Sequence, residues 1–366
     1  MSKFSIPLKF ELQCSIMTKE SIQKIIAKFN LNTGSLQYTP LTNGLINDTY
    51  LVTNDDDQQY ILQKINTHVF KNADVLMDNI QFALPFLSAE DYAHITFLST
   101  LSGKNHLVQD NDFWRMMTYI PNSSTYNTTT QTSTAFEAGR IVGKFHQLMQ
   151  HADTTLFNDT LPKFHNLNFR TQEFQETLRK AETQKKEIAH IAIKKAQSFL
   201  KELQNLNTSI LPVRICHNDT KLNNILFSKS TKKALCLIDL DTIMKGYFFY
   251  DFGDAIRTVV NHAPEDEQNH ELIYFNESLF KAFVDGLAAN GPIFTSAEKE
   301  SLPLGAVFMP FIHGLRALTD YLNNNKYYKV TYENQNLDRC QSLFDFAEKA
   351  LAKKEFMSNY IKKVLV

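Results

Sequence analysis

The chain has 366 residues, of which 43% are hydrophobic, and its 38 basic residues nearly cancel its 39 acidic ones. A chain of this length can bury a sizeable core and exceeds one ordinary compact unit, so we expect two lobes. The balanced charge excludes the basic surface of a nucleic-acid-binding protein. The chain has no apolar run of about 18 residues and no signal-like N-terminus. We therefore expect no membrane partner and a cytoplasmic monomer or homodimer whose four cysteines are reduced.

The N-terminal segment predicts one helix followed by a small antiparallel sheet. Apolar residues recur with helical spacing in residues 17–29, whereas residues 41–45, 49–54 and 60–65 alternate apolar and polar side chains. Lys64 lies on the last of these strands, where a kinase places the lysine that reaches the α- and β-phosphates of a nucleotide. The alternative is a solvated lysine on an exposed strand face.

A second helix is predicted at residues 71–87, directly after the strand that carries Lys64. A helix in this place can supply a carboxylate that pairs with the lysine. Asp78 is the candidate partner, and Asp74 and Asn79 compete with it.

Three further strands are predicted at residues 95–100, 106–109 and 113–119. Pro121 then blocks further ladder pairing, which is typical of a hinge that leads into a second lobe. We expect the backbone of the hinge to bind the edge of an adenine ring, through Thr118, Tyr119 and Ile120.

The rest of the chain is mainly helical, which predicts an α+β protein with unequal lobes. Helices are predicted at residues 134–151, 169–206, 252–261, 272–290, 297–321 and 332–353. We place a nucleotide-binding lobe at residues 1–120 and a catalytic and substrate-binding lobe at residues 121–366. Gly139 and Gly143, four residues apart, indicate close packing between helices.

One short run carries the chemistry, and it lies between two predicted buried strands. Asp219 follows His217 by two residues, Asn224 comes five residues later, and Asp239 ends the next strand. In phosphoryl transfer an aspartate of this kind orients the acceptor hydroxyl, while an amide oxygen and a second carboxylate hold Mg²⁺ on ATP. The bland alternative is that these polar residues are turn formers and that His217 is a packed core histidine. The combined spacing favours a kinase site in which His217 supports the loop.

Two kinase sequence signatures are misleading or missing in this chain. Asp251-Phe-Gly matches a metal-binding tripeptide, but it lies too far after Asp219, so we assign the metal to Asp239, with Asp241 as a further contributor, and Asp251 to a helix N-cap. Neither G-x-G-x-x-G nor a Walker A pattern is present. Residues 43–49, with one glycine, stand where a phosphate-covering loop belongs.

These motifs resemble those of the aminoglycoside phosphotransferase and choline kinase superfamily, and more closely those of the N-acetylhexosamine 1-kinases. The similar segments are residues 44–50, 61–66, 75–80, 138–149, 217–221, 238–242 and 314–322. The resemblance implies a bilobal protein-kinase-like fold. It also implies ATP- and Mg²⁺-dependent phosphorylation of the anomeric hydroxyl of N-acetylglucosamine or N-acetylgalactosamine. Leu45, where that subfamily is expected to carry a polar residue, leaves the sugar preference in doubt.

The resemblance carries functional roles over to individual residues of this chain. Asp219 becomes the base, and Asn224 and Asp239 become the metal ligands. The sugar contacts become Asp48, Arg316 and Tyr321. Arg316 and Asp320 are also spaced i, i+4, so a helix salt bridge is an alternative for both.

Two other functions compete with a sugar 1-kinase. A kinase for choline, homoserine or an aminoglycoside would need a carboxylate-lined pocket, which residues 265–267 could supply. A non-catalytic nucleotide-binding protein of the same fold is the other alternative. It is disfavoured because Asp219, Asn224 and Asp239 are all present.

Overall fold

The computed structural model describes residues 19–31, 36–41, 46–203 and 207–366. The chain forms two compact units, one of residues 1–65 and 96–119 and one of residues 66–95 and 120–366. Residues 66–95, which the sequence predicts in the first lobe, instead pack with the second unit. The functional assignment of the two lobes stays a prediction.

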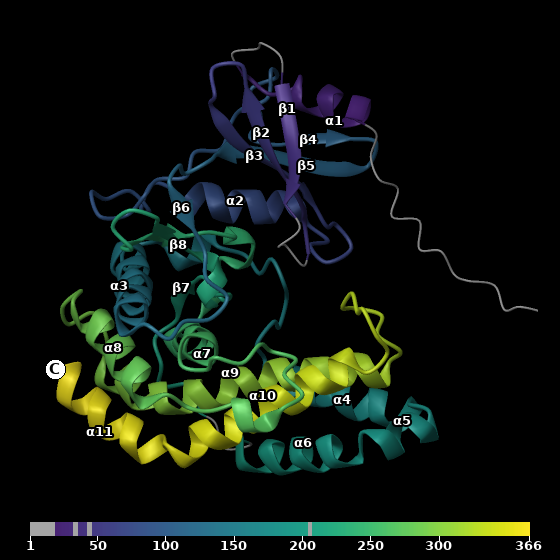
Figure 1. The fold of residues 1–366 in the computed structure, drawn as a ribbon, viewed down its shortest axis with the longest axis vertical. Helices are drawn as coiled ribbons and strands as arrows, with labels where there is room; N and C mark the ends of the chain where they lie inside the picture. Colours follow the sequence, from purple (N-terminus) through teal and green to yellow (C-terminus); the bar gives the residue numbers. More distant parts are fainter. Residues whose placement is uncertain (1–18, 32–35, 42–45, 204–206) are drawn as a thin grey trace, which may run out of the picture. The chain divides into compact units, whose positions relative to one another are not determined.

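The described residues of the first unit form a five-stranded antiparallel sheet and one helix (Figure 1). Its strand order is β1-β2-β3-β5-β4, and the elements are α1 (Lys19–Ile26), β1 (Leu36–Leu41), β2 (Asp48–Asn54), β3 (Gln59–Ile65), β4 (Leu107–Gln109) and β5 (Asp112–Thr118). The apolar face of α1, including Ile22 and Ile26, packs against Val52, Leu62 and Trp114 of the sheet. The apolar side chains that recur with helical spacing in α1 and those that alternate along the strands therefore pack into one core.

Two predictions for this unit need correction or lie outside the described residues. The strand predicted at residues 95–100 forms only isolated bridges, Phe97 with Met117 and Thr100 with Phe29. Residues 42–45, which hold most of the first predicted strand and part of the predicted phosphate loop, lie outside the described residues.

The second unit is mainly helical and carries short strands near its site. Its long helices are α2 (Ala73–Ala83), α3 (Thr132–Met149), α4 (Leu167–Lys180), α6 (His190–Leu203), α7 (Phe248–Val259), α8 (Glu277–Ala288), α9 (Ser296–Leu322), α10 (Gln335–Ala352) and α11 (Lys354–Val364). A short helix, α5 (Thr183–Ile188), interrupts the region predicted as one or two helices. The strands are β6 (Ser123–Ser124), β7 (Arg214–Cys216), β8 (Ile225–Ser228), β9 (Ala234–Leu237) and β10 (Met244–Gly246).

Close packing of α3 on α8 explains the paired glycines. A methyl group added at Gly139 would overlap the carbonyl oxygen of Phe283, and one at Gly286 would overlap that of Phe136. The predicted packing role of Gly139 is confirmed.

Helix α9 is the central helix of the second unit, and α7, α10 and α4 pack along it (Figure 1). Its length and apolar composition would suffice to cross a membrane, but 78% of its most apolar window is buried within the protein. Such burial is typical of a core helix. Cys216, Cys236 and Cys340 are buried free thiols.

Candidate active site

The candidate site is built on the hairpin of β8 and β9. Ile225 pairs with Leu237, so the ends of the two segments that carry Asn224 and Asp239 are adjacent. The N–H of Ile238 donates to the carbonyl of Asn224 at 2.9 Å. A local hairpin therefore brings the two predicted metal ligands to the same edge.

Asp219 and Asn224 are directly bonded across the loop. The amide nitrogen of Asn224 donates to Oδ2 of Asp219 at 2.7 Å and to its backbone carbonyl at 2.8 Å. Because the nitrogen is used in this way, the amide oxygen is the atom of Asn224 that would bind a cation. Oδ2 of Asp219 also accepts from Nζ of Lys221 at 2.9 Å, which leaves Oδ1 for an acceptor hydroxyl.

Lys221 is a site residue that the sequence analysis did not single out. Burial lowers the pKa of Lys221, but the carboxylates of Asp219 and Asp239 outweigh burial and raise that pKa. The ammonium group therefore stays charged beside both carboxylates. Its position only two residues after Asp219 is the feature of the sequence that could have indicated this contact.

Asp239 lies at a bend of the backbone between the end of β9 and a short 3₁₀ turn. Its backbone is left-handed, with φ 62, which an aspartate tolerates better than most residues. The side chain of Asp239 is exposed, whereas that of Asp241 is buried with 2% of its surface exposed. An exposed carboxylate and an amide oxygen are the donor types that Mg²⁺ prefers, so Asn224 and Asp239 fit the predicted ion.

His217 supports the loop through both ring nitrogens. Its Nε2 donates to the carbonyl of Ile238 at 2.9 Å, and its Nδ1 accepts from the N–H of Asp219 at 3.3 Å. A carbonyl only accepts, so these contacts assign the proton to Nε2. His217 therefore links the loop of the candidate base Asp219 to the segment of the candidate metal ligand Asp239.

Asp251 anchors the same loop from α7, and the predicted N-cap role is wrong. Helix α7 begins at Phe248 after Tyr247, and its N-cap residue makes no side-chain cap bond. The fully buried carboxylate of Asp251 accepts from the N–H groups of His217 at 2.8 Å and Asn218 at 2.6 Å. It also accepts from Nε2 of His146 at 2.8 Å. This long-range role had no local signal in the sequence.

Asn218, the residue before Asp219, also holds the loop in place through hydrogen bonds. Its φ is 62, and its amide nitrogen donates to the carbonyls of Thr242 at 3.0 Å and Cys216 at 3.2 Å. Its own carbonyl accepts from Nε2 of His165 at 3.2 Å. The residue before the candidate base is therefore held on both sides.

The predicted nucleotide-binding residues lie in different units. In the first unit Nζ of Lys64 forms an ion pair with Asp112 at 2.7 Å and lies 5.9 Å from the Trp114 ring centroid. In the second unit Asp78 is exposed on α2, while its neighbour Asn79 is 1% exposed. The partner of Lys64 within its own unit is thus Asp112.

The backbone of the predicted hinge is partly used by the first unit. The N–H of Thr118 donates to Thr96 at 2.9 Å, and that of Tyr119 donates to Gln59 at 3.2 Å. The carbonyl of Ile120 accepts from the Ser123 hydroxyl at 2.6 Å. An adenine edge would therefore have to use other backbone groups than the N–H groups of Thr118 and Tyr119.

The three predicted sugar contacts differ in accessibility. Asp48 is exposed at the start of β2, and Arg316 is half-buried on α9. Tyr321 is 0% exposed, and Nζ of Lys185 covers its ring at 4.8 Å from the centroid. A ring buried in the core cannot reach a ligand, so the role predicted for Tyr321 is wrong.

Arg316 and Asp320 do not form the helix salt bridge considered above. The carboxylate of Asp320 accepts from the N–H groups of Tyr327 at 2.8 Å and Tyr328 at 3.0 Å. The guanidinium of Arg316 lies 4.7 Å from the ring centroid of Phe164 and 5.8 Å from that of Tyr327. Arg316 is thus held by aromatic faces.

Residues 265–267 do not form an unpaired carboxylate cluster. Glu265 forms ion pairs with Arg257 and with Arg339. Burial raises the pKa of Glu265, but the neighbouring groups Arg257, Arg339, His313 and Lys221 together outweigh burial and bring that pKa to about 2. Asp266 accepts from the Gln335 amide at 2.9 Å.

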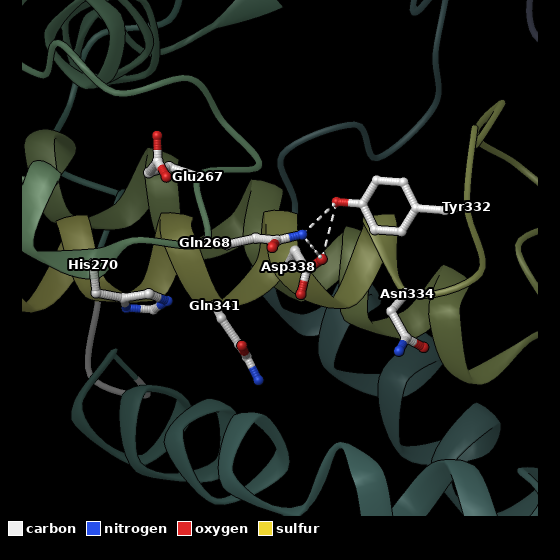
Figure 2. Close-up of a pocket in the computed structure, with 7 residues that line it drawn as sticks. All are labelled: Glu267, Gln268, His270, Tyr332, Asn334, Asp338 and Gln341. Atoms are coloured by element: carbon white, nitrogen blue, oxygen red, sulfur yellow. Dashed lines mark hydrogen bonds between the residues drawn. The ribbon is translucent and has the colours of Figure 1, made fainter.

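A polar cavity of about 380 Å³ lies at the start of α10 (Figure 2). It is lined by Glu267, Gln268, His270, Tyr332, Asn334, Asp338 and Gln341. The Gln268 amide and the Tyr332 hydroxyl both donate to Asp338 at 2.9 Å. Glu267 is one of the carboxylates considered for a cationic acceptor, whereas no residue predicted to bind the nucleotide, the metal or an N-acetylhexosamine lines this cavity.

Comparison with known proteins agrees with the class of the site. The model of the phosphotransferase enzyme family matches residues 37–285, which include the whole candidate loop. The chain belongs to this family and is a phosphotransferase with a bilobal, kinase-like α+β fold.

Solved kinase structures share this fold. An amicoumacin kinase in complex with AMP-PNP, Ca²⁺ and Ami is similar at 13% identity and TM-score 0.60, covering 91% of this chain and 94% of its own. A microcompartment-associated aminopropanol kinase is similar at 17% identity and TM-score 0.59, with coverage of 94% and 98%. Choline kinase from Cryptosporidium parvum is similar at 13% identity and TM-score 0.58, with coverage of 95% and 99%.

Proposed function

We propose that this protein is an ATP-dependent kinase that phosphorylates the anomeric hydroxyl of an N-acetylhexosamine, N-acetylglucosamine or N-acetylgalactosamine. The observation that carries the transfer chemistry is the arrangement around Asp219, whose Oδ2 accepts from Asn224 and Lys221. Two donors on one oxygen orient the carboxylate and leave Oδ1 as the oxygen that can accept the hydrogen bond of a hydroxyl.

The nucleotide side of the proposal assigns Asn224 and Asp239 as ligands of Mg²⁺ carried by ATP. An amicoumacin kinase of the same fold holds AMP-PNP and Ca²⁺, which supports nucleotide and divalent metal use here. When bound, the ion would neutralise charge on the phosphates. Lys64 and Ile120 are the further residues that we assign to ATP.

The transfer step is a single displacement. Asp219 takes the hydrogen bond of the acceptor hydroxyl and receives its proton as the acceptor oxygen bonds to the γ-phosphorus and the bond to the β-phosphate oxygen breaks. Lys221, held charged between Asp219 and Asp239, stabilises negative charge next to the transfer. An anomeric hydroxyl is more acidic than an ordinary alcohol, so a carboxylate suffices as its base.

The charges in the second unit support an uncharged acceptor. Arg316 lies against Phe164, and the next residue, His165, donates to the carbonyl that precedes Asp219. Burial, and then the charge of Arg316, lower the pKa of Arg170. The guanidinium of Arg170 is paired with Glu173, whereas that of Arg316 would repel an ammonium group and can donate to sugar hydroxyl and acetamido oxygens.

The competing acceptors are amino alcohols such as choline, and aminoglycosides. Glu265, one of the carboxylates expected to receive such a cation, is bonded to Arg257 and Arg339. This pairing favours the N-acetylhexosamine. The cytoplasmic location and the monomer or homodimer remain expectations.

The deciding experiment measures ADP release from ATP with Mg²⁺ and a panel of acceptors. The panel contains N-acetylglucosamine, N-acetylgalactosamine, their methyl glycosides, glucosamine, choline, homoserine and an aminoglycoside. We expect turnover with the free N-acetylhexosamines and none with the methyl glycosides, in which the anomeric oxygen is blocked. Turnover confined to the amino alcohols or aminoglycosides would replace the proposed acceptor.

A further inference from the structure

A buried asparagine on α2 joins that helix to the segment of the candidate metal ligand. Asn79 is 1% exposed. Its amide nitrogen donates to the carbonyls of Asn158 and Ile243, each at 2.7 Å, and its amide oxygen accepts from the N–H of Asn158 at 3.1 Å. Both amide hydrogens and the oxygen are therefore used.

Ile243 ends the short segment that begins at Asp239. A single 3₁₀ turn, Leu240–Thr242, separates the two residues. The hydroxyl of Thr242 donates to the carbonyl of His217 at 2.7 Å, which fixes the segment to the loop of the base. The carbonyl of the next residue, Ile243, accepts from the amide of Asn79, which lies 164 positions earlier in the sequence.

The backbone at Asp239 needs such support. Its φ of 62 lies in the left-handed region, which is unfavourable for a residue other than glycine and persists where the surroundings hold it. The side chain of Asp239 is exposed, so burial of that side chain does not hold the bend. The bonds of Ile238 hold the bend from one side, and those of Thr242 and Ile243 contribute from the other side.

We propose that Asn79 is a positioning residue that holds the segment from Asp239 to Ile243 in the conformation that binds the metal. This inference rests on the proposed function for the assignment of Asp239 as a metal ligand. It makes α2, which also packs against the 3₁₀ turn of this segment, a part of the metal site. The alternative is that Asn79 only stabilises the packing of α2.

The test uses Asn79→Ala and Asn79→Ser, with Gln81→Ala as the matched control at an exposed position of the same helix. Mg²⁺ is titrated against each protein at saturating AMP-PNP, well below the melting temperature, without any acceptor. We expect the Mg²⁺ concentration for half-maximal binding to rise about tenfold in both Asn79 variants and to stay unchanged in Gln81→Ala. Hydrogen exchange of residues 239–246 without metal should rise in the Asn79 variants alone.

Variants of Asn79 that are less stable but bind Mg²⁺ and exchange like the wild type would show a packing role and overturn the inference. Should both variants fail to fold, exchange of the wild-type protein decides. Addition of Mg²⁺ with AMP-PNP must then protect residues 239–246 and the peptide of α2 together, and protection of the first alone would overturn the coupling. Failure of N-acetylhexosamine turnover leaves these binding results intact, whereas a wild type that binds no Mg²⁺ with nucleotide would overturn both proposals.

Discussion

The amide nitrogen of Asn224 lies 2.7 Å from Oδ2 of Asp219 and donates to it. One loop residue thus orients the candidate base with its nitrogen and offers its oxygen to a cation. The same bond fixes which oxygen of Asp219 remains for an acceptor. The candidate base and the candidate metal ligand are therefore coupled by a hydrogen bond, and a change in either should disturb the other.

Replacing Asp219 with Asn tests the base. The amide keeps the shape of the side chain but cannot accept a proton, so we expect kcat to fall about a thousandfold, or roughly 4 kcal/mol in activation free energy. Nucleotide affinity, measured by calorimetry with AMP-PNP and Mg²⁺, should change less than threefold. Turnover like that of the wild type would remove Asp219 from its role.

Replacing Asp251 with Asn tests the anchor of the loop. The buried carboxylate accepts from two backbone N–H groups and from His146, and an amide would direct a donor at one of them. We expect a loss of about 3 kcal/mol in the free energy of unfolding, measured by denaturant titration. Glu271→Gln, at an exposed carboxylate, is the control and should change stability by less than about 0.5 kcal/mol.

His165 predicts a dependence of stability on pH. Burial, followed by the charges of His313 and Arg316, lowers the pKa of His165 well below its usual 6.5. The native state therefore excludes a proton that the unfolded state binds below about pH 6.5. His165 thus contributes stability above that pH, and the contribution is lost progressively as the pH falls toward its native pKa.

Denaturant titrations between pH 7.5 and 5 should show this loss, with a slope of up to about 1.4 kcal/mol per pH unit from this one group. In His165→Gln the amide can still donate to Asn218, and the slope should decrease by that amount. An unchanged slope in the variant would assign the pH dependence to other groups, of which His313 is one with a lowered pKa.

The grouping of the candidate catalytic and metal-binding residues could be predicted because these residues are local in sequence. Asp219, Asn224 and Asp239 are brought together by one hairpin, and a hairpin follows from its alternation and turn. The roles of Asp251 and Asn79 depend on bonds to residues 34 and 164 positions away, which no periodicity encodes. Local rules accordingly placed Asp251 at an N-cap.

Helical residues show the same limit. Arg316 and Tyr321 lie on α9, a helix that is buried along most of its length, so its sequence pattern does not distinguish the face that meets a ligand from the face that meets α5. Only the packing of Lys185 on Tyr321 shows that this ring belongs to the core. Arg316 and Tyr321 were both plausible sugar contacts by residue type, and only their different burial distinguishes them.

Arg316 and Tyr321 therefore form a matched pair of tests for acceptor binding. Replacing Arg316 with Met removes a guanidinium that can donate to sugar oxygens, a bond worth about 1.5–3 kcal/mol, so kcat/KM for the N-acetylhexosamine should fall about ten- to a hundredfold. Arg316→Lys keeps the charge without the planar fork and should recover only part of the loss. Tyr321→Phe keeps the buried ring, so kcat/KM should stay within twofold of the wild type. The reverse pattern, with Arg316→Met silent and Tyr321→Phe impaired, would place the acceptor on the other face of α9.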